Sequence, residues 1–307
     1  MKRHAIRLTG SRANGARLSA VAMRDFLDAL LASARHAVRL RVDGRGLAGA
    51  TPTWLEKVSD IDVLPLEAGS TQVVIEAPAL AEAAPERFSQ MDFVLALNPN
   101  MTSIDVLEES LGEALAGDAS SDKFDAGLLR TFGAFSKLWR HQIEGVEFDG
   151  GKRVRLDPAA TARLESLQSQ IPADQRTMVV GKIDLLHHSK RMFTVRTDDG
   201  KDLRGAFVNE DVSLESLGQL FGQRACVSGV AKFRPSGDLL LIEAEAISPA
   251  DEGLSVLSVA PKPLFSTLDT RALHRSQGPK SGVAAVFGRW PGDESDEEVE
   301  ALLAEMS

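Results

Sequence analysis

The sequence predicts an α+β protein in several parts, of which a five-stranded β-barrel is the most sharply defined. Alternating and helical patterns are mixed near the start, helical spacing prevails in the middle, and five β-rich runs cluster further on. We therefore expect a sheet–helix unit at 1–88 and a mainly helical segment with a β-hairpin at 89–172. The barrel then occupies 173–250, and a flexible linker plus an acidic helix occupies 251–307.

The first unit begins with a strand and a helix. Residues 4–9 alternate between apolar and polar side chains, which is the period of a half-buried strand. Ser19 is a suitable N-cap for the helix that follows, whose apolar residues recur at 3.6-residue spacing. Residues 38–42 alternate again and predict a second strand, and residues 61–75 predict a hairpin. The helix is expected to cover one face of this sheet.

The predicted second strand raises a functional question. Arg39 and Arg41 would share one face of it, and such a face could hold phosphate. Asp60 and Asp62 share a face of the neighbouring segment, so cross-strand ion pairs are the favoured alternative.

The middle segment is dominated by helical stripes. One runs from Ile104 to Leu115, and a denser aromatic stripe runs from Phe124 to Trp139. A turn at 148–151 predicts a hairpin, and Asp157 followed by Pro158 predicts a helix start. The aromatic stripe could form a partner groove, although packing in the protein's own core is the favoured interpretation.

The barrel is predicted from five strand patterns. Asp199-Gly200 is a hairpin signal, and a helical pattern at 212–221 separates the third strand from the fourth. The strand patterns cover 178–186, 193–197, 203–207, 224–231 and 239–247.

This order of elements, the Val179-Val180-Gly181 opening and the Gly222–Gly229 entry into the fourth strand resemble an OB-fold, with a small SH3-like barrel as the alternative. The resemblance implies a ligand face on strands two and three with two adjoining loops. Residues 176–249 carry ten basic and ten acidic side chains, which favours a structural or protein-binding barrel over a nucleic-acid barrel. The nucleic-acid-binding residues implied by the resemblance are Lys190, Arg191, Phe193, Lys232, Phe233 and Arg234.

The tail carries the signals of a short docking helix. Ser295 and Glu298 form a capping box, and acidic residues fill the first turn. An apolar stripe follows, as expected for a helix that packs on a partner or on the protein itself. The residues predicted to bind a partner are Trp290, Val299, Leu302, Leu303 and Met306.

The phrase Gly288–Glu298 resembles the C-terminal ends of uncharacterised bacterial proteins. Some of these are encoded beside toxin–antitoxin modules with PIN-domain ribonucleases. The resemblance implies a protein-docking tail and an association with a toxin–antitoxin-type system. The chain is longer than usual antitoxins and lacks an evident DNA-binding motif at its start, so no functional residues follow from this resemblance.

Composition excludes several classes of function. A net charge of −9 argues against bulk adhesion to nucleic acid or anionic membranes. The single cysteine, Cys226, excludes an internal disulfide, and no apolar run approaches the ~20 residues of a membrane span. We expect a cytoplasmic protein that binds no membrane.

The sequence contains no recognisable catalytic or metal-binding motif. We find no zincin motif, phosphate-binding glycine loop or nucleophile elbow, and we expect His187-His188 to form an exposed loop rather than a metal site. We therefore expect no enzyme activity, metal or cofactor. The favoured hypothesis is a binding or regulatory adaptor that docks a protein partner through its C-terminal helix. The alternatives are a single-stranded nucleic-acid-binding protein that uses the barrel loops, and an enzyme of unrecognised class.

Overall fold

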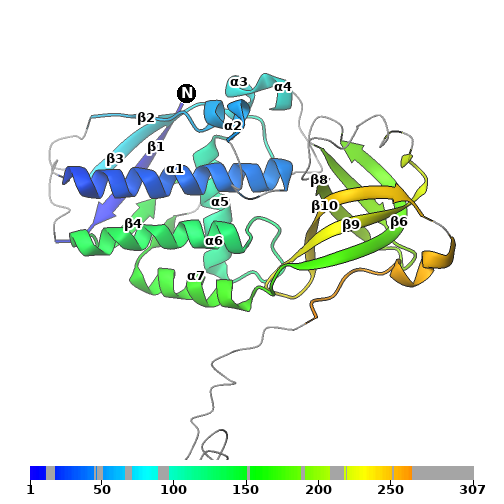
Figure 1. Ribbon diagram of the computed structural model, residues 1–307. Helices are drawn as coiled ribbons and strands as arrows, with labels where there is room; N and C mark the ends of the chain where they lie inside the picture. The colour runs from blue at the N-terminus through cyan, green and yellow to red at the C-terminus, as the bar shows by residue number, and fades with distance from the viewer. Residues whose placement is uncertain are drawn as a thin grey trace, which may run out of the picture. The chain divides into compact units, whose positions relative to one another are not determined.

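The computed structural model confirms the α+β class (Figure 1). It describes residues 1–11, 18–44, 46, 51–65, 71–88, 97–150, 153–187, 191–207, 218, 220–250 and 252–264. The chain divides into Met1–Thr267, which contains the fold described below, and Leu268–Ser307, which lies outside the described residues. The predicted C-terminal helix therefore stays a prediction.

The first part of the fold contains a mostly short-stranded antiparallel sheet. Its strands lie in the order β2-β3-β1-β4-β5, with β1 at the centre. Ile6 and Leu8 of β1 are buried against the helices, whereas Arg3 lies on the open face and pairs with Glu76 across the sheet at 2.7 Å. The strands are β1 (Lys2–Thr9), β2 (Asp62–Val63), β3 (Gln72–Ala77), β4 (Gly145–Phe148) and β5 (Val154–Leu156).

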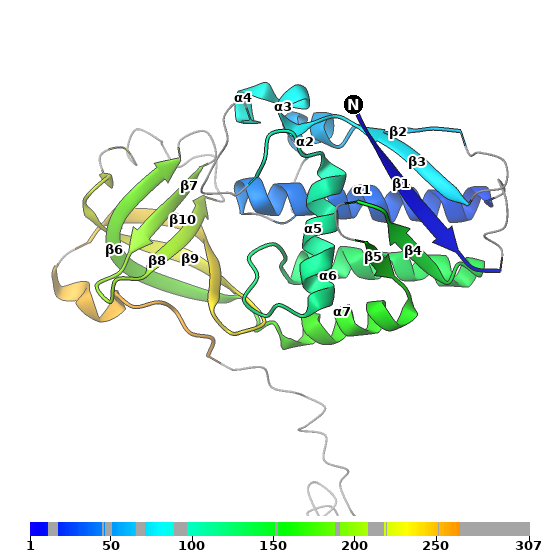
Figure 2. The same cartoon turned by 180° about the vertical axis from the view of Figure 1, so that it is seen from behind.

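Helices cover one face of this sheet. α1, α6 and α7 lie side by side in front of the strands in Figure 1 and behind them in Figure 2. α5 runs across α1 on the side that carries the sheet. The helices of this part are α1 (Ala20–Asp43), α2 (Thr53–Val58), α3 (Leu80–Ala83), α4 (Pro85–Phe88), α5 (Ser103–Ala116), α6 (Ala126–Gly133), the 3₁₀ helix η1 (Ala134–His141) and α7 (Pro158–Gln170).

Side-chain caps fix where four of the helices begin. Ser19, Thr102, Asp125 and Asp157 each accept a hydrogen bond from a backbone N–H of the first turn. Such caps satisfy amide groups that have no partner inside the helix. The helix starts predicted at Ser19 and Asp157 are thus confirmed.

The prediction of a strand at 38–42 is wrong. These residues form the last turns of α1, which ends at Gly44 with φ of 66°. Arg39 and Arg41 are both buried there, and Arg41 pairs with Glu109 of α5 at 3.3 Å. Packing on neighbouring elements has overridden the local β-like alternation of the sequence.

The segments expected at 1–88 and 89–172 share one core. Phe26 of α1 meets Phe135 of η1 edge to face, and Phe135 meets Phe148 of β4 in the same way. The predicted hairpin at 148–151 is the β4–β5 connection, and it extends the sheet that β1 began. The aromatic stripe of the middle segment is therefore core, as favoured.

The barrel forms as predicted from the strand patterns. It closes in the order β10-β8-β7-β6-β9, with β8 and β10 parallel and the other pairs antiparallel. This is an OB-like arrangement. Its strands are β6 (Gln175–His187), β7 (Met192–Arg196), β8 (Asp202–Phe207), β9 (Arg224–Phe233) and β10 (Leu239–Pro249).

Close backbone contacts explain the glycines of the barrel strands. A Cβ atom at Gly229 would lie 2.1 Å from the carbonyl oxygen of Glu243, which no larger residue could tolerate without a shift. Gly181 approaches the backbone of Arg196 in the same manner. Most of the helix predicted at 212–221 lies outside the described residues.

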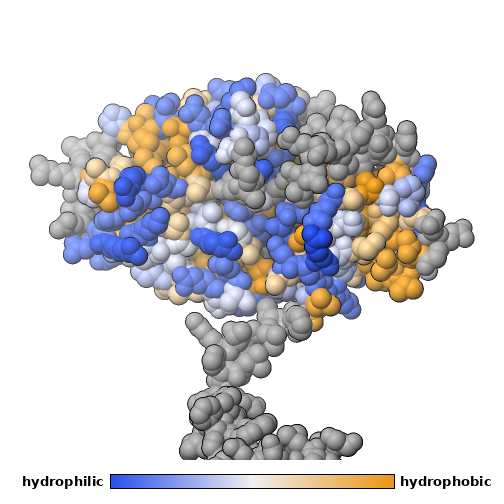
Figure 3. All heavy atoms as spheres, viewed as in Figure 1, coloured by the Kyte–Doolittle hydropathy of each residue, from blue (hydrophilic) through white to orange (hydrophobic). Residues whose placement is uncertain are grey.

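A second 3₁₀ helix, η2 (Glu252–Leu257), follows the barrel and packs on β6. Apolar surface gathers on this side of the barrel in Figure 3, and Val256 and Val259 of this segment are exposed. None of the described helices is both long and apolar enough to cross a lipid bilayer.

Candidate functional site

A groove of about 950 Å³ runs beside α5 on the α/β part of the molecule. One wall is α5 itself, and the opposite wall comes from β5, the start of β1 and the segment before α5. Side chains of both charges rim the groove, whereas Met101, Leu115 and Val154 supply apolar lining. A concave site of this size with a few convergent polar groups is typical of a ligand-binding cleft.

Glu108 is the most unusual side chain of this groove. The residue is 7% exposed, and no hydrogen-bond or ion-pair partner for its carboxylate exists among the described residues. Gly150 covers it so closely that a Cβ there would lie 1.5 Å from Oε2. Burial, together with the charges of Asp105 and Asp149, raises the pKa of Glu108 to about 7, although Lys2 opposes the shift.

A hydrogen-bonded network lies one turn before Glu108. Thr102 Oγ1 lies 2.9 Å from Nε2 of His4 and donates to Asp105, which in turn accepts two hydrogen bonds from Lys2 Nζ. Although burial alone would raise it, hydrogen bonds from Thr102 and Lys2 hold the pKa of Asp105 below its ordinary value. Thr102 is fully buried and caps α5, so this network positions the helix rather than offering a nucleophile.

The other acids of the groove have partners. Glu109 and Glu113 pair with Lys123, and Glu109 also pairs with Arg41. On the opposite wall, Arg155 pairs with Glu147 and Asp157. Among the carboxylates lining the described groove, Glu108 is thus the one left for a ligand.

The position of Glu108 in the sequence is itself a signal of a functional role, which the sequence analysis missed. Glu108 follows Ile104 by four positions and precedes Leu111 by three, so it lies within the apolar stripe of α5. An ionisable side chain at a core position of a helix is a candidate functional group.

The structure buries the two residues that were predicted to stack on bases. Phe193 and Phe233 are each 1% exposed, and Phe193 packs on Phe207 with ring centroids 4.6 Å apart. Phe193 belongs to the barrel core, and neither ring presents a free face on which a nucleotide base could stack.

The described basic residues that were predicted to bind nucleic acid have different surroundings. Lys232 pairs with Asp174 and Glu243, and these acids hold its pKa above its ordinary value although burial opposes this. Arg191 takes a left-handed conformation with φ of 53°, and its carbonyl accepts a hydrogen bond from Phe207. Arg234 lines a small cleft of about 360 Å³ with Thr194, Arg204 and neighbouring residues. Lys190 lies outside the described residues.

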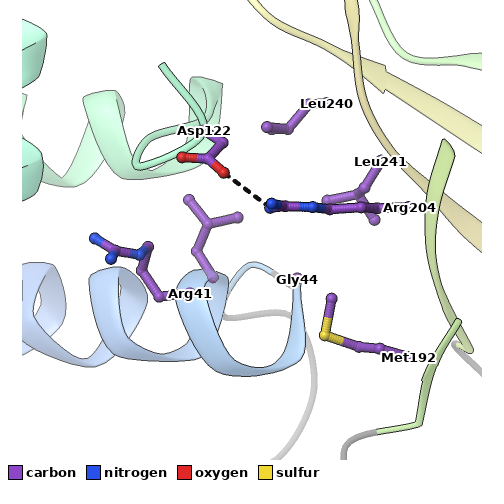
Figure 4. Close-up of a pocket in the computed structure, with 8 residues that line it drawn as sticks. Arg41, Gly44, Asp122, Met192, Arg204, Leu240 and Leu241 are labelled. Atoms are coloured by element: carbon purple, nitrogen blue, oxygen red, sulfur yellow. Dashed lines mark hydrogen bonds and ion pairs between the residues drawn. The ribbon is translucent and has the colours of Figure 1, made fainter. Parts of the chain in front are cut away.

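Part of the barrel face that OB-folds use for ligands packs on the α/β part instead. Met192, Ala206, Leu240 and Leu241 belong to the same hydrophobic core as α1. Figure 4 shows this junction, a cavity of about 30 Å³ into which Met192 and Leu241 project beside Gly44. Arg204 of β8 crosses the junction and pairs with Asp122 at 2.8 Å.

Arg196, an exposed arginine of β7, also has acidic partners. Arg196 pairs with Asp184 at 2.9 Å and with Asp202 at 2.8 Å. The barrel therefore shows paired charges on this face rather than the basic stripe expected of a nucleic-acid-binding surface.

The described residues include neither the predicted C-terminal docking site nor a group of metal ligands. The predicted partner-binding residues Trp290, Val299, Leu302, Leu303 and Met306 lie outside the described residues. Within the described part of the chain, no group of three or more histidine, cysteine, aspartate or glutamate side chains could hold a metal ion.

Comparison with known proteins gives no match. No family model, no curated protein and no solved structure resembles this chain significantly.

Proposed function

We propose that the protein is a non-catalytic binding protein that holds a segment of a protein partner in the groove beside α5. The observation that carries this proposal is the contrast between two surfaces. The groove is open and contains a buried carboxylate with no partner among the described residues, whereas part of the barrel's usual ligand face packs in the same core as α1. On this proposal the OB-like barrel is a structural module that holds the C-terminal end of α1 and the loop of Asp122.

The C-terminal helix is a second proposed contact with the same partner. Its support is the sequence alone, namely the capping box at Ser295 and Glu298 and the apolar stripe after it. We also propose an association with a toxin–antitoxin-type system, which the resemblance of Gly288–Glu298 supports. A cytoplasmic location is proposed from composition.

The alternative of single-stranded nucleic-acid binding rests on one observation. Arg204 and Arg234 line the same small cleft on the barrel, and two guanidinium groups there could contact a phosphate. Burial of Phe193 and Phe233 and the pairing of Arg204 with Asp122 favour the adaptor.

A photo-crosslinking amino acid at Ala116 tests the groove. Ala116 is exposed on α5 and lines the groove, so a partner held there would be captured from the native host. Ala162 is exposed on α7 and lies outside the groove, which makes it the matched control. A protein adduct specific to position 116 and insensitive to nuclease supports the proposal. Adducts with nucleic acid, or identical adducts from both positions, would overturn it.

Truncation tests the tail separately. A chain that ends at Gly288 should still give the adduct at position 116, but with reduced yield if the helix adds a second contact. An unchanged yield would remove the tail from the proposal and leave the groove in place.

A further inference from the structure

We infer that the groove beside α5 recognises a lysine or arginine side chain of the partner, with Glu108 as the anion that receives it. This inference rests on the proposed function, and it specifies the chemistry of the same site. Its basis is the position of Glu108, the charges around it and the apolar lining of the groove.

The carboxylate of Glu108 is buried and has no donor among the described residues. Burying an ionisable group without a partner is costly, so a native protein that retains one commonly uses it. Glu108 is more than nine-tenths buried and lines the groove, and the described residues supply it with no hydrogen-bond donor. A cationic donor from outside would complete this missing pairing.

Acidic side chains outweigh basic ones among the described charges that act on Glu108. Asp105 on the same helix and Asp149 in the β4–β5 turn are both close enough to disfavour its ionisation. Among the described residues, the cation that acts on the pKa of Glu108 is Lys2 of β1, which is already held by two 2.9 Å hydrogen bonds to Asp105. Among the described residues that act on Glu108, acids therefore outnumber cations, which favours an ammonium or guanidinium group over a neutral or anionic one.

Apolar side chains form part of the groove that leads to the carboxylate. Met101, Leu115 and Val154 line the groove with apolar surface. Lysine and arginine carry an aliphatic stem below the charged group, and such stems pack well along apolar walls. Arg153, which is exposed at the groove, would disfavour a second cation on the same ligand.

Binding should be coupled to proton release. The free carboxyl of Glu108 titrates with a pKa of about 7, and a cation favours its ionised form. Because the ionised fraction falls about tenfold between pH 8 and pH 6, affinity for a cationic ligand should fall by about the same factor.

The experiment uses the full chain and three small probes. These are the N-acetyl methylamides of lysine, arginine and norleucine, each titrated into the protein while carboxyl ¹³C resonances are followed by NMR. Norleucine has a similar aliphatic stem but no charge. We expect the lysine or arginine probe to shift the Glu108 resonance and the norleucine probe to bind at least about tenfold more weakly.

Glu108→Gln is the decisive variant. It keeps the shape of the side chain and removes the charge, and it should weaken binding of the cationic probe about tenfold or more. Glu165→Gln makes the same charge change on exposed α7 and should leave the affinity unchanged. Equal binding of the norleucine probe, or full affinity in Glu108→Gln, would overturn the inference.

The two proposals can fail separately. The Glu108→Gln variant could bind the cationic probe as tightly as the original chain and still give the adduct at position 116. The groove would then bind a partner, but Glu108 would not recognise a cation. If no groove-specific adduct forms in either chain, the proposed function itself fails.

Discussion

Asp125 and Glu108 are two buried carboxylates of the same α/β part, and their surroundings differ in one respect. Asp125 has a partner within the protein, since His36 Nε2 lies 3.1 Å from Oδ1 and Leu128 N–H donates to the same oxygen. Although burial alone would raise it, the contact with His36 and the backbone hydrogen bond from Leu128 hold the pKa of Asp125 below its ordinary value. Glu108 has no such partner among the described residues, and burial raises its pKa to about 7. Similar burial therefore gives opposite shifts, because the partner decides the sign.

The difference separates structural from functional acids. Asp125 is the N-cap of α6 and completes a buried pair between two helices. Its role is fulfilled inside the fold. Glu108 performs no comparable task, which is why it is the better candidate for contact with an external group.

Removal of Asp125 should have the largest effect on stability. Asp125→Ala leaves His36 buried without its partner and α6 without its cap, so we expect a loss of about 4 kcal/mol in urea unfolding near neutral pH. The pKa of Asp125 is lowered, so its contribution is present above the unfolded value of 3.8 and is lost as the pH falls through the folded value.

Asp157→Ala is the matched control for that variant. Asp157 caps α7 in the same manner but is only partly buried and has no histidine partner, so its removal should cost about 1 kcal/mol. Equal losses in the two variants would show that the His36–Asp125 pair adds nothing beyond the cap.

Neutralisation of Glu108 should act in the opposite direction. Its folded pKa is about 7 against an ordinary value of 4.5, so the folded state binds more protons between these values and stability falls as the pH rises through them. Glu108→Gln should therefore raise the unfolding free energy by about 3 kcal/mol at pH 8 and by little at pH 4. A loss of stability at pH 8 would reveal an internal partner for this carboxylate.

A smaller effect should follow from Asp105→Asn. The charge of Asp105 raises the pKa of Glu108, so its removal should lower that pKa, as measured by carboxyl ¹³C NMR. Burial is the larger cause, so the pKa should remain well above the ordinary value of 4.5. A fall to the ordinary value would show that Glu108 is much less desolvated than its surroundings indicate.

The smallest effect is expected for the half-exposed pair between Arg204 and Asp122. The side chains are 42% and 38% exposed, and such pairs are worth at most about 1 kcal/mol. Arg204→Ala should lower the unfolding free energy by less than this amount, and the loss should shrink further in high salt. A larger loss would mean that the ion pair, rather than the apolar contact of Met192 and Leu241, holds the barrel to α1.

The barrel was the part of the fold most fully predicted from the sequence. Its strands follow from local patterns, since alternation, the Asp199-Gly200 turn and the flanking glycines are all short-range signals. The same holds for the helix starts at Ser19 and Asp157, because a cap acts on the first turn of its own helix. These features are determined by the sequence itself.

Tertiary contacts decided what the sequence patterns left open. Residues 38–42 alternate like a strand, yet they end a helix because Arg41 finds Glu109 and the apolar side chains find a core from segments far along the chain. Phe193 and Phe233 could have stacked on bases or filled a core, and the folded chain buries both. Burial is the largest cause of the raised pKa of Glu108, and the charge of Asp105 on the same helix is the local contribution to it. The protonation of Glu108 also depends on Gly150, Lys2 and Asp149, which only the folded chain brings beside it, because burial and charge act through space rather than along the sequence.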